Sequence, residues 1–285
     1  MIKLVMDSAA DINKQEAEQK GIIMIPMLIT IGEEEYYDGV NLSSQEFWEK
    51  LVESDVLPKT SLINTFRFEE LFETHTKDGD ELIVITISSK LSGTYESARQ
   101  AAEKFNGKVH VIDSLNACVG ERLLCDYALR LIKQGLSVKE IVNELEDKKN
   151  KIKVMALLGT LEYLKKGGRI STAAAFAGEI ISIKPVVGVI NGEVKLIGKA
   201  IGSRKGNNLL SKLVQESGGI NFSMPFATIW SGLDTSLLDK YIKDSANIWA
   251  GHTDNVPKYI LGATIGTHVG PGVVGVAFFE NKGNK

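Results

Sequence analysis

The first half of the chain alternates between short apolar runs and stretches whose apolar residues recur at helical spacing. Runs rich in β-branched residues, which are typical of buried strands, cover residues 2–6, 22–31, 81–87 and 109–112. Amphipathic stretches that predict helices cover residues 13–20, 43–51, 65–74, 95–105, 117–134 and 137–147. Ser43 with Glu46 predicts a capping box, and Asn64 predicts a helix cap. Strands that alternate with helices in this way predict a parallel sheet covered on both faces.

The pattern changes after a charged run at residues 144–151, which marks a candidate boundary between domains 1–150 and 151–285. Beyond it, strands are predicted over residues 154–158, 186–190, 193–198, 226–230 and 259–262, with a last strand ending at 279. Helices are predicted from residue 160 and over residues 171–181, 205–217 and 236–246. Asn191-Gly192 predicts a type I′ hairpin between two of these strands. The expected α/β fold is therefore a parallel α/β/α domain followed by a mixed-sheet α/β domain.

Composition narrows the class of protein without identifying it. The 285 residues are 44% hydrophobic and 24% charged, with a net charge of −3, which is typical of a soluble globular protein and gives no reason to expect a nucleic acid partner. The apolar start is too short for a signal peptide, and Glu179 and Lys184 interrupt the longest weakly polar stretch. Cys118 and Cys125 lie two helical turns apart, about 10 Å, too far for a disulfide. They are expected to be buried thiols in a reducing cytoplasm.

The hydroxyl-rich stretch from Ser88 to Ala98 is the first candidate site. It follows an apolar strand and leads into a helix, so Ser92, Gly93 and Thr94 stand where backbone N–H groups and a helix dipole favour an anion. A carboxylate or phosphate would fit there. The alternative is an ordinary capped strand–helix loop, since serine and threonine are common helix caps. Three polar pairs, expected at the carboxyl edge of the parallel sheet, are Asp7-Ser8, Ser88-Ser89 and Asp113-Ser114.

Other candidates supply hydrogen-bond donors without an evident nucleophile or base. His268 lies in the glycine-dense stretch 266–275, predicted as a loop, and Arg204 follows a strand where it could clamp a carboxylate. Thr60-Ser61 lies in a predicted loop. Each has an ordinary alternative as a turn, cap or exposed residue, and Lys165, Lys166 and Arg169 would normally form a solvated face. No P-loop, dinucleotide-binding glycine pattern or His/Cys cluster occurs, so no cofactor or metal is expected.

Taken together, these stretches resemble the DegV family, the fatty-acid-binding proteins of bacteria. The resemblance runs from about residue 2 to 279, and its motifs are Asp7-Ser8, Thr60-Ser61, Ser88-Ser89-Lys90-Leu91-Ser92-Gly93-Thr94-Tyr95, Asp113-Ser114, Leu161-Glu162-Tyr163-Leu164-Lys165-Lys166-Gly167-Gly168-Arg169-Ile170, Lys184-Pro185 and Ile265-Gly266-Thr267-His268-Val269-Gly270-Pro271-Gly272. The basic run around Arg204 is thinner than is usual in the family.

The resemblance implies a long-chain fatty acid bound between the two domains. It implies that the carboxylate is held by donors at Thr60, Ser61, Ser92, Gly93, Thr94, Arg204 and His268. The chain would then be a cytoplasmic carrier that offers the carboxylate to a separate ATP-dependent fatty acid kinase and makes, at most, transient contact with a membrane. Lys165, Lys166 and Arg169 would be candidates for docking the kinase.

Two further functions stay open at the level of the sequence. The first is an acyl- or phosphoryl-transfer enzyme with Ser92 as nucleophile and His268 as base, which requires the two side chains to meet within about 3 Å. The second is a regulatory module that senses a small anion, which a cavity too short for an acyl chain would favour.

Overall fold

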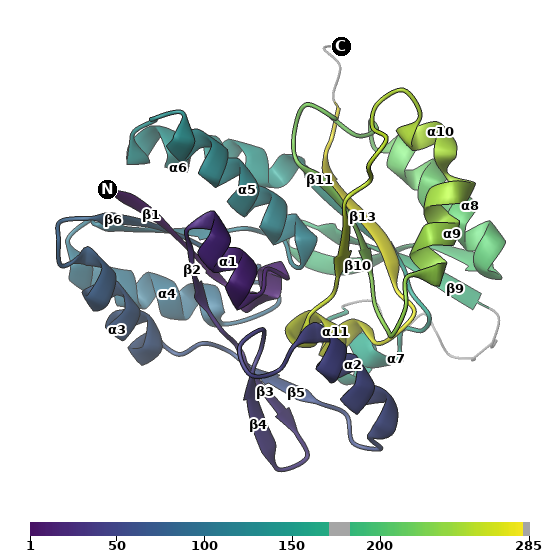
Figure 1. Ribbon diagram of the computed structural model, residues 1–285, viewed down its shortest axis with the longest axis horizontal. Coiled ribbons are helices and arrows are strands. Elements are labelled where there is room, and N and C mark those ends of the chain that lie inside the picture. Colours follow the sequence, from purple (N-terminus) through teal and green to yellow (C-terminus); the bar gives the residue numbers. More distant parts are fainter. Residues whose placement is uncertain (171–182, 282–285) are drawn as a thin grey trace.

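The protein folds around three β-sheets in the computed structural model, which describes residues 1–170 and 183–281 (Figure 1). A four-stranded sheet uses residues before 114, and a six-stranded sheet uses residues from 152 onward. A small three-stranded sheet, from residues 28–61, lies beside them. The mixed α/β architecture expected from the sequence is confirmed. Within the described residues, no helix is long and apolar enough to cross a membrane.

The four-stranded sheet is parallel throughout, in the order β2–β1–β6–β7. Its strands are β1 (Ile2–Asp7), β2 (Ile22–Ile25), β6 (Glu81–Thr86) and β7 (Val109–Asp113). Helices α3 (Thr65–Thr76) and α4 (Thr94–Ala102) cover one face, and α5 (Val119–Lys133) and α6 (Val138–Lys148) cover the other (Figure 1). Because both faces are covered, the side chains of Val5, Ile83 and Val84 are fully buried, as continuous apolar strands require.

Polar caps start the helices where the sequence pattern places them. Helices α1 (Lys14–Lys20), α2 (Ser44–Glu53), α3 and α6 each begin after a residue whose side chain accepts a hydrogen bond from a first-turn N–H group. These caps are Asn13, Ser43, Asn64 and Ser137. The predicted capping box of Ser43 and Glu46 is present.

The six-stranded sheet has the order β10–β9–β8–β13–β11–β12 and is antiparallel except between β11 and β12. Its strands are β8 (Ile152–Leu157), β9 (Ile183–Ile190), β10 (Glu193–Ile201), β11 (Phe226–Trp230), β12 (Lys258–Ile260) and β13 (Val274–Phe279). The predicted hairpin joins β9 to β10, with positive φ at Asn191 (53°) and Gly192 (83°) as a type I′ turn requires.

Helix α5 lies between the two large sheets. It packs against β1 and β6 of the parallel sheet and against β8, β11 and β13 of the mixed sheet. Helices α8 (Ser203–Glu216), α9 (Ser236–Asp244) and α10 (Ala246–Trp249) gather on the other side of the mixed sheet (Figure 1). Leu210, Tyr241 and Phe278 form part of the apolar cluster that α8 and α9 share with that sheet. Helix α5 therefore links the two large sheets.

Three local predictions were wrong. The apolar run 22–31 forms two strands, β2 and β3 (Leu28–Ile31), because Pro26 has no N–H group to continue the ladder. Residues 59–61, predicted as loop, form β5 (Lys59–Ser61), and the polar stretch after Gly32 contains β4 (Glu34–Tyr37). These edge strands pair with β3 in the order β4–β3–β5.

The glycine-dense stretch 266–275 is also different from the prediction, because its first residues are helical. They belong to α11 (Ala263–Val269), and the loop that follows leads into β13. A shorter helix, α7 (Glu162–Lys166), contacts α11. The helix predicted over residues 171–181 lies outside the described residues.

Candidate functional site

A cavity of about 280 Å³ lies between the parallel and mixed sheets. A single water needs roughly 10–15 Å³ on this scale, so the space is large enough for an organic ligand. Its walls are mainly apolar and come from both halves of the chain. The apolar lining includes Met27, Ile87, Ala117, Val154, Ala156, Leu158, Leu164, Val187, Val189, Val194, Ile229, Leu261, Ile265, Val269 and Val273.

Polar side chains contribute to the same lining. Of the residues predicted to bind a carboxylate, the cavity is lined by Thr60, Ser61, Ser92, Gly93 and His268. They come from β5, from the turn between β6 and α4, and from α11. The structure therefore brings three separate segments of the predicted site together around one cavity. Ser61 and Gly93 are exposed, which opens this part of the lining to solvent.

The turn between β6 and α4, residues 87–93, is called the hydroxyl turn here, and Thr94 holds it in place. Ser92 Oγ lies 2.9 Å from Thr94 Oγ1 and accepts a hydrogen bond from the Thr94 backbone N–H group at 3.2 Å. Thr94 is buried, and its Oγ1 also accepts from the N–H group of Ile63 at 3.2 Å. Thr94 does not line the cavity. Its contacts fix the orientation of Ser92 and tie the turn to the segment that follows Thr60.

Gly93 lets the hydroxyl turn lie close to Leu62, the residue that follows β5. A Cβ atom at this position would lie 2.9 Å from Cδ2 of Leu62, closer than real Cβ contacts come. Leu62 lines the cavity and is half-exposed. The glycine therefore lets the hydroxyl turn and the end of β5 meet at the cavity without a side chain between them.

Thr60 and His268 share a hydrogen bond, with 2.9 Å between Oγ1 and Nε2. Thr60 is paired with Ile29 in the small sheet, and His268 lies in the last turn of α11. Burial lowers the pKa of His268 to about 4, and the charge of Arg169 adds to this shift. The imidazole is consequently neutral near pH 7, with one N–H donor and one acceptor nitrogen. Its Nδ1 is buried, and no described group hydrogen-bonds to it.

Arg169 is the cation that the structure places at the cavity. It follows α7 after Gly167 and Gly168, and the positive φ of Gly168 (67°) turns the chain back toward the hydroxyl turn. Its Nε donates to the carbonyl of Leu91 at 3.2 Å, and Nη1 donates to the carbonyl of Gly167 at 2.5 Å. These bonds hold the guanidinium group beside the candidate site, although the sequence suggested Arg169 for partner docking.

Arg204 does not reach the cavity lining. It is exposed in the first turn of α8. Hydrogen bonds from Lys240 and Asn207 lower the pKa of Asp244 on α9, and the charge of Arg204 makes a smaller contribution. Lys165 and Lys166 are both exposed on α7, and Lys166 pairs with Glu162 at 2.5 Å. The structure thus separates the predicted cations: Arg169 is at the cavity, whereas Arg204, Lys165 and Lys166 are not among its lining residues.

The polar pairs at the carboxyl edge of the parallel sheet shape its loops. Asp7 accepts hydrogen bonds from the N–H groups of Ala9 at 2.9 Å and Ile87 at 2.8 Å. Asp113 Oδ1 accepts from Ser89 at 3.1 Å and from Leu115 at 3.0 Å. Neither aspartate lines the cavity. Both act by holding the segments that carry cavity residues.

Ser92 and His268 have different hydrogen-bond partners. Ser92 bonds to Thr94 and His268 bonds to Thr60, and the described residues include no hydrogen bond between Ser92 and His268. A nucleophile activated by a base would need that contact. The observed geometry is instead that of two hydroxyl groups, each oriented by a neighbour.

Sequence reasoning missed the apolar walls of the cavity. Ala156, Val187 and Ile229 lie on strands β8, β9 and β11, and each looks in the sequence like any buried strand residue. No periodicity distinguishes a side chain that faces a cavity from one that faces the core. Among the lining residues that were not predicted to bind the carboxylate, Arg169 did have a recognisable sequence signal. It ends the Lys-Lys-Gly-Gly-Arg segment, which was predicted as a docking surface.

The fold and the site define a class: an α/β protein with an apolar cavity between its two large sheets and hydroxyl groups in the cavity lining. A family model described as an uncharacterised protein of the DegV family matches residues 1–281. The chain belongs to the DegV family. It is 31% identical over 285 residues to a DegV domain-containing protein of Caldanaerobacter subterraneus, with 99% of each chain covered.

Solved structures of similar fold include proteins that bind fatty acids. A fatty-acid-binding DegV family protein from Thermus thermophilus matches with a TM-score of 0.86 and 28% identity, covering 97% of this chain and 98% of that chain. A stearic-acid-binding protein from Eubacterium ventriosum matches with a TM-score of 0.84 and 26% identity, covering 99% of each chain. Both cover nearly the whole chain, so the similarity includes both large sheets.

Proposed function

We propose that this protein binds a long-chain fatty acid in the cavity and presents its carboxylate to a separate ATP-dependent fatty acid kinase. The observation that carries the proposal is an apolar cavity with Thr60, Ser92 and Arg169 in its lining. The fatty acids bound by its structural neighbours support the same ligand class. In this proposal residues 1–150 and 151–285 are the two domains that enclose the ligand.

The hydroxyl groups suit a carboxylate because each can keep a proton for it. If the neutral His268 donates from Nε2 to Thr60 Oγ1, the Thr60 hydroxyl proton is available to the ligand. If Thr94 donates to Ser92 Oγ, the Ser92 proton is likewise available. Arg169 adds a positive charge that favours an anion. Two hydroxyl donors and a nearby cation are sufficient to hold a carboxylate without any group that attacks it.

The apolar lining suits an acyl tail. Each buried methylene contributes about 0.8 kcal/mol to transfer from water, so a tail of about 14 to 16 methylenes has a gross gain of roughly 11–13 kcal/mol. Part of this gain is offset by the freedom that the tail and protein lose on binding. The tail would provide most of the affinity, and the hydroxyl groups would set its direction.

The carrier role requires that the bound carboxylate can be reached from solvent. Ser61 and Gly93 are exposed in the lining next to Thr60 and Ser92, so a carboxylate there would stand near solvent. Lys165 and Lys166 lie exposed on α7, which precedes Arg169, and would offer positive charge to an acidic kinase surface. We place this exchange in the cytoplasm. The separate partners of Ser92 and His268 favour a carrier over a transferase.

Binding is tested with delipidated protein and oleate or palmitate. Thr60→Val and Ser92→Ala should each weaken binding about tenfold or more, because each removes a hydrogen bond to a charged group. Thr74→Val is the matched control, since Thr74 is exposed on α3 and bonds only to the Glu70 carbonyl. Fluorescence displacement and calorimetry would measure the constants. Failure of wild-type protein to bind either fatty acid would overturn the proposal.

Docking is tested separately with a fatty acid kinase and the loaded protein. Lys165→Glu with Lys166→Glu should slow phosphorylation of bound fatty acid while leaving its binding constant unchanged, because both lysines lie outside the cavity lining. Phosphorylation at the wild-type rate in the double variant would exclude these lysines as the docking site.

A further inference from the structure

His268 is carried by a helix whose first-turn donors are capped by residues more than 220 positions away. Gly262, which precedes α11, makes no side-chain cap of its own. The N–H groups of Ala263 and Thr264 donate to Asp38 at 3.1 and 3.2 Å, and the Thr264 hydroxyl donates to Asp38 Oδ2 at 2.5 Å. Both carboxylate oxygens of Asp38 are thus used by the first turn of α11.

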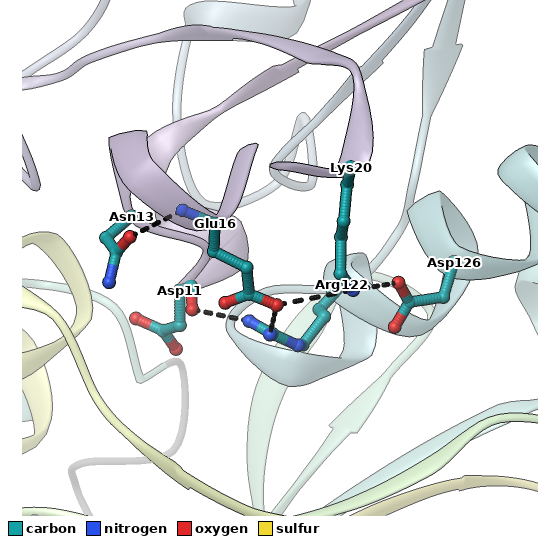
Figure 2. A network of polar contacts seen from close by, with 6 residues as sticks. All are labelled: Asp11, Asn13, Glu16, Lys20, Arg122 and Asp126. Carbon is teal, nitrogen blue, oxygen red and sulfur yellow. Dashed lines mark hydrogen bonds and ion pairs between the residues drawn. The ribbon is translucent and has the colours of Figure 1, made fainter. Parts of the chain in front are cut away.

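Asp11 supports the same end of the helix. Its Oδ1 accepts from the Gly262 N–H group at 2.7 Å. Its backbone carbonyl accepts from Arg122 of α5 at 2.7 Å, and Arg122 also pairs with Glu16 (Figure 2). A Cβ atom at Gly262 would lie 3.2 Å from Asp11 Oδ1 and 3.3 Å from Asp38 Oδ1. Glycine at 262 therefore lets both carboxylates approach the start of α11.

Asp38 is itself rigidly held. It is 3% exposed, and its N–H group donates to the carbonyl of Met27 at 3.0 Å, directly after β4. The strand β3 beside it pairs with both β4 and β5, and Thr60 lies on β5 opposite Ile29. The small sheet thus supports the cap of α11 at one edge and Thr60 at the other.

The cap is close to His268 along the helix. Thr264 and His268 are four residues apart, which is about one turn and places them on the same face. Helix α11 has seven residues, about two turns, so a shift of its first turn is passed directly to the next turn, which carries His268. A shift of the capped turn would therefore move His268 relative to Thr60, its partner at 2.9 Å.

We propose that Asp38 is a positioning residue that sets the orientation of His268, and through it the Thr60 hydroxyl, by capping α11 across the molecule. The consequence for the ligand rests on the proposed fatty acid function, whereas the consequence for His268 does not. Asp38 does not line the cavity, and its side chain bonds to Ala263 and Thr264 of α11, so this helix is its direct connection to His268.

The direct test follows the His268 ring in ligand-free protein by NMR of the histidine Cε1–H groups, of which the chain has four. His268→Asn identifies the signal. In Asp38→Asn the amide keeps the size of the side chain but cannot accept at both atoms, so α11 loses part of its cap. We expect the His268 signal to shift and its pKa to rise from about 4 toward 6.5 as the ring leaves its buried position.

Asp80→Asn is the matched control. Asp80 is also buried, but it pairs with the terminal amine at 2.5 Å and with Lys3 at 2.6 Å. It precedes β6, whereas the hydroxyl turn follows β6, so the two lie at opposite ends of that strand. It should lower the melting temperature while leaving the His268 signal unchanged. A folded Asp38→Asn protein with a wild-type His268 signal and pKa would overturn the proposal.

If Asp38→Asn does not fold, substitutions at Thr264 provide the second test. Thr264, which also lines the cavity, offers two substitutions: Thr264→Val replaces the hydroxyl that donates to Asp38 with a methyl group, and Thr264→Ser keeps the hydroxyl. The valine variant should shift the His268 signal and the serine variant should restore it, and equal spectra for the two would refute the proposal. Oleate affinity measured on Asp38→Asn should fall about tenfold. If the signal shifts but wild type binds no fatty acid, the proposed function fails and the positioning role stands.

Discussion

Asp7 ends β1 with a carboxyl group that is fully buried. Burial raises its pKa to about 7, although the N–H groups of Ile87 and Ala9 act in the opposite direction. The unfolded chain releases this proton near pH 3.8, so between about pH 4 and 7 the folded state holds a proton that the unfolded state does not. The stability contributed by this group is present at low pH and is lost as the pH rises toward 7.

Asp7→Asn removes that titration and should flatten the pH dependence of stability. Between pH 4.5 and 6.5 the free energy of unfolding should fall less steeply than in wild type, by up to about 1.4 kcal/mol per pH unit. Asparagine can satisfy only one of the two N–H groups, so near pH 4.5 the variant should be less stable by about 1–3 kcal/mol, and this deficit should shrink as the pH rises. Urea unfolding across the pH series measures the slope, and equal slopes would contradict the assignment.

Of the residues that the sequence proposed for a ligand site, some lie at the cavity and others, such as Arg204, do not. Thr60, Ser92 and His268 lie in segments with strong local patterns, and the structure brings all three to the cavity. Arg204 looked favourable because it follows a strand, yet it ends exposed on α8. Arg169 reaches the cavity through a glycine turn whose direction no periodicity encodes.

At the scale of elements, the sequence predicted best where structure is local. Strands β1, β6 and β7 and the capped helices carry their own periodicity and caps, and they were found where expected. The prediction failed at α11, where four glycines in the ten residues 266–275 indicated a loop. Its caps come from Asp11 and Asp38, and no local pattern can reveal a cap supplied from the other end of the chain.

A substitution at Gly266 tests whether α11 contains this glycine because a larger side chain would not fit against α2. Alanine there would gain about 1 kcal/mol of helix propensity. However, its Cβ atom would collide with the ring of Phe47 and lie 2.9 Å from the ring of Trp48, both of which are fully buried on α2. We expect Gly266→Ala to destabilise the protein by about 1–3 kcal/mol in denaturant unfolding, because overpacking outweighs propensity.

The control for Gly266→Ala is the double variant with Phe47→Leu. Removing the ring should relieve part of the collision, so the two changes together should cost less than the sum of their separate effects. Additive losses would show that the glycine matters for some reason other than its packing against α2.

For the whole molecule, the cavity depends on contacts that join distant parts of the chain. The hairpin turn of the mixed sheet docks on the hydroxyl turn, where Ser88 Oγ donates to the carbonyl of Gly192 at 2.8 Å. Trp48 Nε1 of α2 donates to the carbonyl of Leu261 at 2.9 Å. The sequence predicted two kinds of sheet, but the space between them depends on such long-range pairs and could not be predicted from local patterns.

Because residues from both halves line the cavity, a bound ligand should stabilise the molecule as a unit. Oleate at a free concentration of about 100 times its Kd should add about 2.7 kcal/mol, which raises the melting temperature by roughly 4–5 °C for a chain of this size. Methyl oleate has the same tail without the charge, so it should give a clearly smaller rise at the same concentration. Differential scanning calorimetry below the micelle concentration makes the comparison. Equal shifts for acid and ester would mean that the tail alone is recognised, and that Thr60, Ser92 and Arg169 do not select a carboxylate.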